Sequence, residues 1–176
     1  MATHKLMIAG FGGQGVLLIG QMIAYAAVKE GKEVTWMPSY GPEMRGGTAN
    51  CTVVVSDKPI AAPLITEATA VVAMNGPSLD KFESMVIPGG DLFVNSSQPD
   101  CEAHRKDVNV HEVDLVRIAD ELGNSKVANM VMLGAIVRTT GIVSLDSVKE
   151  VIREKMTGKK AALVPLNEKA LESWTK

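Results

Sequence analysis

The stretch that decides the fold is "GFGGQG", residues 10–15. It follows the apolar run "HKLMIA" (4–9) and precedes "VLLIGQMIAYAAV" (16–28), where apolar residues recur at helical spacing. Its glycines match the G-x-G-x-x-G pattern that opens many dinucleotide-binding domains. The stretch therefore predicts a buried strand, a glycine turn and a helix.

Beyond this unit, strand patterns and helix patterns alternate along the chain. Strands are predicted over 5–9, 33–37, 51–56, 68–75, 90–97 and 108–113, and helices over 15–30, 77–86, 114–122, 127–138, 144–156 and 166–174. The stretch 38–50, rich in Pro and Gly, is predicted to be a loop. The alternation favours βαβ units. We expect one domain, residues 1–176, with a Rossmann-like open, mainly parallel sheet and helices on both faces.

Composition narrows the class of function. The 18 basic and 20 acidic residues nearly balance, and no basic block stands out, which disfavours a nucleic-acid or membrane surface as partner. No apolar run reaches the length of a membrane span, and the N-terminus has no signal-peptide layout. The cysteines, Cys51 and Cys101, lie far apart without a C-x-x-C, so we expect reduced thiols in a cytoplasmic protein. They also disfavour a metal site or iron–sulfur cluster held by this chain alone.

The glycine turn meets only half of the requirement for an NAD site. Such a site needs an acidic residue at the end of the second strand to bind the ribose hydroxyls. This strand ends in "TWMPSYG", with Met37 and Pro38 at that position. Three interpretations stay open: a dinucleotide, a turn that merely packs helix against sheet, or another anion or partner group at the helix start.

In an open parallel sheet, ligands lie beyond the carboxyl ends of the strands. The segment after the second strand is long and places Arg45 among glycines and prolines. Its guanidinium suits a phosphate or carboxylate, or equally a structural ion pair with Glu43 or with an acid of a partner chain. The sequence shows no catalytic constellation and no metal-ligand cluster. The candidate cofactor-binding residues are Gly12, Gly13, Gln14, Gly15, Ser39, Tyr40, Arg45 and Asn75.

The run from Ile8 to Ser56, with "GGQG" (12–15) and "PSYGPEMRGGTANC" (38–51) as its most specific parts, carries more information than the glycines. It resembles the gamma subunit of 2-oxoacid:ferredoxin oxidoreductases, also called the pyruvate/ketoisovalerate oxidoreductase gamma domain. The likeness continues through "VVAMN", "IPGGDLFVNSS" and "VANMVMLGAIV", and so covers nearly the whole chain.

The resemblance implies a multi-subunit anaerobic enzyme that decarboxylates a 2-oxoacid, releases an acyl-coenzyme A and reduces ferredoxin. Thiamine diphosphate and iron–sulfur clusters would lie on partner subunits of the alpha, beta and delta types, and none would be bound by this chain alone. The chain fits this role, because it lacks cluster-type cysteine spacing and Leu92 follows Gly90-Asp91, which breaks the Gly-Asp-Gly opening of a thiamine motif. Coenzyme A at a shared site is part of the same expectation. Within the family, "EMRGGTANC" looks more like the 2-oxoglutarate and branched-chain 2-oxoacid enzymes than the pyruvate ones, and of these we favour 2-oxoglutarate as the substrate.

Three hypotheses follow for the function. The leading one is an accessory gamma subunit that acts in assembly and helps to hold coenzyme A, while the isolated chain is not catalytic and dimerises through its exposed docking surface. The second is a free-standing NAD(P)- or flavin-binding oxidoreductase. The third is an interaction module whose glycine turn binds nothing.

Overall fold

The computed structural model describes residues 3–40 and 48–176. It contains the predicted strand–turn–helix unit as β1 (Thr3–Phe11), a turn at residues 12–15 and α1 (Val16–Lys29). Strand β1 is longer than predicted and includes Gly10, so the glycine pattern begins inside the sheet. The helix then leaves from the carboxyl end of a central strand.

A sheet with the order β2-β3-β1-β4-β5-β6 forms the centre of the molecule. The remaining strands are β2 (Glu33–Tyr40), β3 (Thr48–Ser56), β4 (Ala68–Ala73), β5 (Val86–Asn95) and β6 (Asn109–Val113). Strands β1, β4, β5 and β6 pair in parallel, whereas β3 is antiparallel to both β1 and β2. The mainly parallel Rossmann-like sheet is confirmed, with one antiparallel strand inserted beside β1.

The prediction that residues 38–50 are all loop is wrong at both ends. Pro38 pairs with Cys51, and the ladder continues to Tyr40 opposite Ala49. The loop prediction rested on the local preferences of Pro and Gly, but the sheet edge accommodates Pro38 because an edge strand does not need every N–H in the ladder. The part of the predicted loop from 41 to 47 lies outside the described residues.

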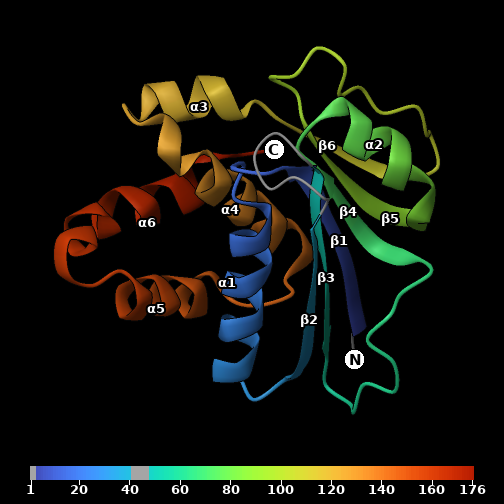
Figure 1. Ribbon diagram of the computed structural model, residues 1–176, viewed down its shortest axis with the longest axis horizontal. Helices are drawn as coiled ribbons and strands as arrows, with labels where there is room; N and C mark the ends of the chain where they lie inside the picture. The colour runs from blue at the N-terminus through green and yellow to red at the C-terminus, as the bar shows by residue number, and fades with distance from the viewer. Residues whose placement is uncertain (1–2, 41–47) are drawn as a thin grey trace.

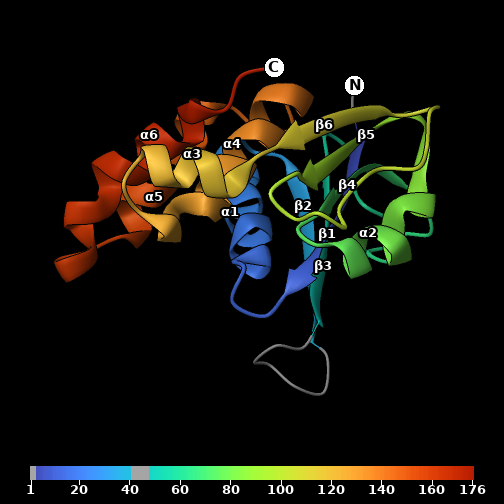
Figure 2. The same ribbon diagram turned by 90° about the horizontal axis from the view of Figure 1, so that it is seen from above.

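Helices cover the two faces of the sheet unequally (Figure 1). They are α2 (Gly76–Phe82), α3 (Leu115–Glu121), α4 (Ala128–Thr140), α5 (Leu145–Lys155) and α6 (Val164–Ser173), with short 3-10 turns η1 (Glu83–Met85), η2 (Ser125–Val127) and η3 (Gly158–Leu163). Figures 1 and 2 show α1 and α3–α6 on one side and α2 on the other. Within the described ranges, no helix is long and apolar enough to cross a membrane.

Side chains that alternate along the strands divide the core in two. Leu6, Ile8 and Phe93 belong to the larger cluster, under α1 and α4. Met7 and Leu92, their neighbours along the strands, belong to a smaller cluster under α2. Because both faces of Leu6–Ala9 and Leu92–Val94 are buried, these parts of β1 and β5 are continuous apolar runs, as expected for parallel strands. This packing anchors the carboxyl edge, where the turn after β1 lies.

Candidate functional site

A pocket of about 340 Å³ lies beside the turn after β1, at the carboxyl edge of the sheet and on the side covered by α1 and α3–α6 (Figure 2). Segments far apart in the sequence form its walls: the turn after β1, the end of β5, the start of α3, and η2 with the first turn of α4. The residues that line it include Gly13, Gln14, Gly15, Asn95, Gln98, Val116, Lys126 and Asn129. The strand ends thus bring a candidate site together at the position expected for an open α/β sheet.

The start of α1 gives the pocket its anion-binding character. Gly15, the N-cap, has a left-handed backbone with φ of 75°, and within the described residues no side chain caps this end of the helix. The first-turn N–H groups of a helix lack intrahelical partners and carry a partial positive charge. An uncapped helix start that opens on a pocket suits a phosphate or carboxylate group.

Asn129 forms the opposite wall. It is half-buried, because the apolar surface of α4 opens at this point onto the pocket. A Cβ built on Gly15 would lie 2.4 Å from Nδ2 of Asn129, which shows how closely the helix start and α4 approach each other. The role of Asn129 as a pocket wall could not be read from sequence, although its polar side chain stood out in an apolar helix.

Lys126 is the one charged side chain among the described residues of the pocket wall. It lies in η2, where the side chain of Asn124 accepts a hydrogen bond of 2.9 Å from the Lys126 N–H. This bond satisfies the start of η2 and holds the backbone of Lys126 in place. The lysine adds positive charge to the same pocket that the α1 N-terminus faces.

The α3 wall is fixed by a short polar network. Asp114 caps α3 by accepting from Arg117 N–H at 3.2 Å, and it also accepts from the Ser97 hydroxyl at 2.7 Å. The bond from Ser97 is the main reason that the pKa of the Asp114 carboxyl falls below its usual value. The carboxylate therefore stays ionised and anchors the helix that carries Val116.

The predicted binding residues divide into three groups. Gly13, Gln14 and Gly15 line the pocket, and Gly12 lies in the same turn. The side chain of Asn75 is instead occupied in the protein, because its Oδ1 accepts from Ser78 N–H at 2.9 Å and caps α2.

The third group comes from the stretch 38–50, which the sequence predicts to be a loop. Ser39 and Tyr40 lie in β2, which is separated from β1 by β3. Ser39 is thereby placed about 10 Å across the sheet from β1, at two strand spacings. Arg45 lies outside the described residues. The position of β2 in the sheet could not be predicted from the sequence, because a strand pattern does not show which other strands it pairs with.

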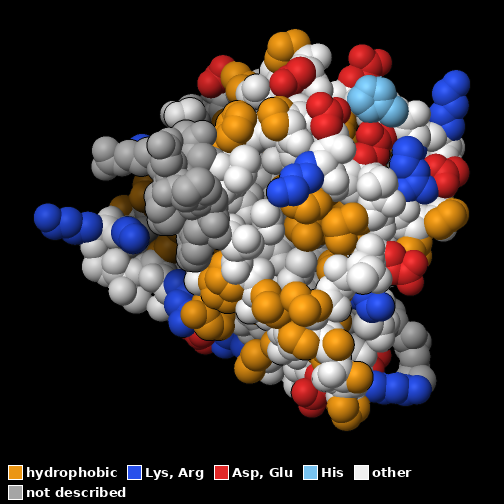
Figure 3. Space-filling view, turned by 45° about the vertical axis from the view of Figure 1, so that its right-hand side comes forward, with side chains coloured by type: hydrophobic (Ala, Val, Ile, Leu, Met, Phe, Trp, Pro, Cys, Tyr) orange, Lys and Arg blue, Asp and Glu red, His pale blue; other side chains and the backbone are white. Residues whose placement is uncertain are grey.

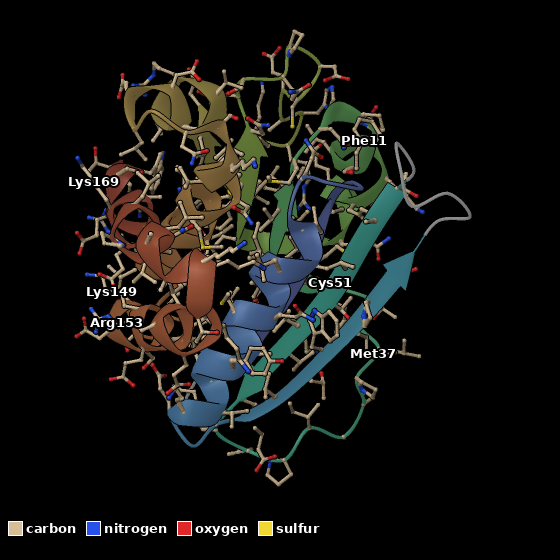
Figure 4. The ribbon with its side chains drawn as sticks, turned by 60° about the vertical axis from the view of Figure 1, so that its left-hand side comes forward. Phe11, Met37, Cys51, Lys149, Arg153 and Lys169 are labelled. Atoms are coloured by element: carbon tan, nitrogen blue, oxygen red, sulfur yellow. The ribbon has the colours of Figure 1, made fainter. Side chains whose placement is uncertain are left out.

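Strand order also bears on the dinucleotide hypothesis. In a dinucleotide-binding unit, the strand whose acid binds the ribose is adjacent to the strand that carries the glycine turn. Here β3 stands between them, and β2 carries Met37 and Pro38 near its end. Figure 4 shows Met37 pointing away from the helices. The arrangement gives no support to an NAD site.

The cysteines are placed where neither can act in this pocket. Cys51 is buried in the larger core cluster and Cys101 in the smaller one, on opposite faces of the sheet. Burial raises the pKa of the Cys51 thiol to about 12 and that of Cys101 to about 11. In the part of the chain that is described, no group of His, Cys, Asp and Glu side chains could hold a metal ion.

Comparison with known proteins shows which protein family the chain matches. Residues 5–173 match the family described as "Pyruvate ferredoxin/flavodoxin oxidoreductase". The chain is 39% identical over 171 residues to the ketoisovalerate oxidoreductase subunit VorA of Methanothermobacter marburgensis, covering 96% of this chain and 35% of that protein. It is 35% identical to the 2-oxoglutarate synthase subunit KorC of Methanocaldococcus jannaschii, covering 86% of this chain and 83% of that protein. The chain thus spans about a third of the first relative and most of the second.

A further relative and two solved structures also match nearly the whole chain. The "pyruvate/ketoisovalerate oxidoreductases common subunit gamma" of Thermococcus kodakarensis is 35% identical, covering 96% of this chain and 93% of that protein. The keto/oxoacid ferredoxin oxidoreductase gamma subunit of Geobacter sulfurreducens superposes with a TM-score of 0.81 at 30% identity, over 97% of this chain and 95% of that one. A 2-oxoglutarate:ferredoxin oxidoreductase chain of Magnetococcus marinus shares the fold, with a TM-score of 0.89 at 24% identity, over 98% of this chain and 30% of that one.

Proposed function

This chain belongs to the pyruvate ferredoxin/flavodoxin oxidoreductase family, and from that membership we propose that it is the gamma subunit of a multi-subunit 2-oxoacid:ferredoxin oxidoreductase. The family expected from "GGQG" and the run Pro38 to Cys51 is confirmed. The complex would oxidatively decarboxylate a 2-oxoacid to an acyl-coenzyme A and pass the electrons to ferredoxin. Its place of action, on this proposal, is the cytoplasm.

The described residues of this chain do not fit the iron–sulfur clusters or the thiamine diphosphate of such a complex. Two cysteines buried on opposite faces of a sheet cannot ligate one iron–sulfur cluster. Leu92, which replaces the second glycine of a Gly-Asp-Gly opening, is fully buried in β5. We therefore assign thiamine diphosphate and the clusters to partner subunits of the alpha, beta and delta types. The gamma chain supplies a binding and docking surface.

We propose 2-oxoglutarate as the 2-oxoacid. The support is the sequence "EMRGGTANC", together with relatives of nearly the same length that are named 2-oxoglutarate synthase subunits. Relatives named for ketoisovalerate and for pyruvate make those acids the competing substrates. Ferredoxin reduction by the purified complex should be faster with 2-oxoglutarate than with pyruvate or ketoisovalerate at equal concentration. A preference for either of the other acids would replace this assignment.

Coenzyme A is the ligand that we propose for the carboxyl-edge pocket. The observation that carries this proposal is the uncapped start of α1, which opens beside Lys126 on a pocket of about 340 Å³. A phosphate of the coenzyme would accept hydrogen bonds from the first-turn N–H groups and pair with the lysine. Arg45, on the sequence argument, is a second candidate cation. Among the described lining residues, no hydrogen bond pairs a nucleophile with a general base, so we propose that this chain only binds and orients the coenzyme.

The test is a pair of single substitutions in the reconstituted complex. Lys126→Ala and Arg45→Ala should each raise the KM for coenzyme A several-fold and leave the KM for the 2-oxoacid unchanged. Lys58→Ala is the matched control, because Lys58 is exposed beyond the opposite end of β3. An unchanged KM in both variants would rule out these cations as a coenzyme site and leave docking as the function of this edge.

Docking is supported by apolar side chains on the surface. Phe11 is 37% exposed at the end of β1, and Val116 is 53% exposed on the pocket wall. On the face in Figure 3, hydrophobic side chains gather in groups while most charged ones lie toward the rim. Apolar patches of this kind are typical of interaction surfaces. We propose that partner subunits cover them in the complex and that the isolated chain dimerises through them.

A further inference from the structure

Three amide side chains meet at the carboxyl edge, one from each of three adjacent parallel strands. Gln14 follows β1, Asn75 follows β4, and Asn95 ends β5. The carbonyl oxygen of Met74 accepts from Gln14 Nε2 at 3.3 Å and from Asn95 Nδ2 at 3.1 Å. Asn75 Nδ2 donates to Gln14 Oε1 at 3.2 Å. These four residues, which we call the amide network, tie together the ends of β1, β4 and β5.

Gln14 holds the central position in the amide network. Its Oε1 also accepts from the Phe11 N–H at 2.7 Å, so its side chain closes the turn that begins at the end of β1. A Cβ built on Gly10 would lie 2.6 Å from Gln14 Oε1, 2.8 Å from Val16 Cγ2 and 2.9 Å from Met74 Cβ, so the glycine leaves room for the Gln14 amide. Both polar atoms of the Gln14 amide are therefore engaged by the protein itself.

We propose that Gln14 is a positioning residue of the carboxyl-edge pocket and not a ligand of its occupant. It fixes the turn at residues 12–15 against the β4–α2 connection, and this sets the direction of the free N–H groups at the start of α1. The other two amides are buried, at 2% exposure for Asn75 and 3% for Asn95. Asn75 donates to Gln14, and Asn95 donates to the Met74 carbonyl that Gln14 also binds. The effect on the ligand rests on the proposed function, whereas the effect on the turn does not.

A physical reason favours positioning over direct binding. The amide group would have to give up its hydrogen bonds with Phe11 and Met74 before it could bind a ligand. The Met74 carbonyl would keep its bond from Asn95, but the Phe11 N–H would lose its acceptor. A helix start, by contrast, binds anions through N–H groups that are free already. Fixing the direction of those groups in advance lowers the cost of ordering them on binding.

The first experiment measures the turn in the full chain without any ligand. Gln14→Leu removes all three hydrogen bonds of the side chain, and amide hydrogen exchange of Phe11 should accelerate roughly ten-fold or more. Gln14→Glu keeps the acceptor for Phe11 and Asn75 but loses the donor to Met74, so its exchange should be intermediate. Gln98→Leu, also on the pocket wall, should leave Phe11 exchange unchanged. If Phe11 exchanges at the wild-type rate in both Gln14 variants, the positioning role is overturned.

The second experiment measures the ligand in the reconstituted complex. Gln14→Leu should raise the KM for coenzyme A with a much smaller change in kcat, and Gln14→Glu should restore part of the affinity at low pH, where the introduced carboxyl is protonated and donates again. If Phe11 exchanges faster in Gln14→Leu and its KM is unchanged, while Lys126→Ala raises the KM, the role of Gln14 in positioning the site for its ligand is overturned. If Lys126→Ala and Gln14→Leu both leave the KM unchanged, coenzyme A does not use this pocket. The proposed coenzyme site then fails, while the effect of Gln14 on the turn is still decided by the exchange of Phe11.

Discussion

The backbone of Gly15 packs directly against the side chain of Asn129. A Cβ at Gly15 would lie 2.4 Å from Nδ2 and 2.8 Å from Cβ of Asn129, and the glycine has a φ of 75°. One position therefore combines a left-handed backbone with a close approach between the start of α1 and the start of α4.

Gly15→Ala should destabilise the chain by roughly 2–3 kcal/mol, because the added methyl group is strained by the positive φ and overlaps Asn129. Gly13→Ala is the matched control. Gly13 has a φ of 92° but nothing within 4 Å of its Cβ direction, so it should cost only the backbone strain. Urea unfolding of both variants measures the difference. The steric explanation is wrong if the two substitutions cost the same, or if Asn129→Ala fails to restore part of the loss in Gly15→Ala.

Glu30 should make folding depend on pH in the acid range. Burial opposes its ionisation, but hydrogen bonds from the Ser144 N–H at 2.6 Å and from Lys32 at 2.9 Å outweigh burial and lower its pKa to about 2. A depressed folded-state pKa stabilises above the unfolded value near 4.5, and this contribution is lost as the pH falls toward 2.

Glu30→Gln should therefore lower the free energy of unfolding at pH 7 by roughly 1–2 kcal/mol, allowing for solvent screening. The difference from wild type should shrink between pH 4.5 and pH 2. Urea titrations across that range measure it. A constant difference at every pH would show that packing, and not the charge of Glu30, is responsible.

His104 should add a pH dependence of the opposite sign. A hydrogen bond of 3.0 Å to Glu83 is the main reason that the pKa of His104 is raised. A raised folded-state pKa stabilises the protein below the unfolded value near 6.5 and ceases to do so as the pH rises through the folded value. His104→Asn should thus be less stable than wild type at pH 6 and nearly equal to it at pH 9. Equal stability of the two proteins at pH 6 would contradict an ionic bond to Glu83.

Cys51 and Cys101 should be unreactive in the folded chain. Burial raises both thiol pKa values, so little thiolate forms at pH 8, and Cys51 lies fully buried under α1 (Figure 4). An aromatic disulfide reagent should modify them at least roughly a hundred times more slowly than an exposed thiol introduced by Lys58→Cys. Both should react quickly in 8 M urea. Fast modification of native wild-type protein would contradict the burial.

The elements could be predicted from the sequence where the signal is local. The strand–turn–helix unit around "GFGGQG" and the four C-terminal helices lie within a few residues of their predicted bounds, because apolar periodicity and glycine turns act over neighbouring residues. Residues 38–40 and 48–50, which belong to β2 and β3, could not be assigned to strands from the sequence, because Pro38 and the glycines after it outweigh the strand pattern. Pairing with Cys51 and Ala49 restores those residues to the sheet.

By itself the sequence determined the family, the α/β class and the turn that lines the pocket, since each depends on residues close together in the chain. Only the tertiary structure decided that β3 separates β2 from β1, which moves Ser39 away from Gly15. It also decided that Lys126 and Asn129 complete the pocket and that the amide of Gln14 is engaged by Met74. These relationships join residues distant in sequence, and their physical cause is the packing of α4 and the order of the strands, which no local pattern encodes.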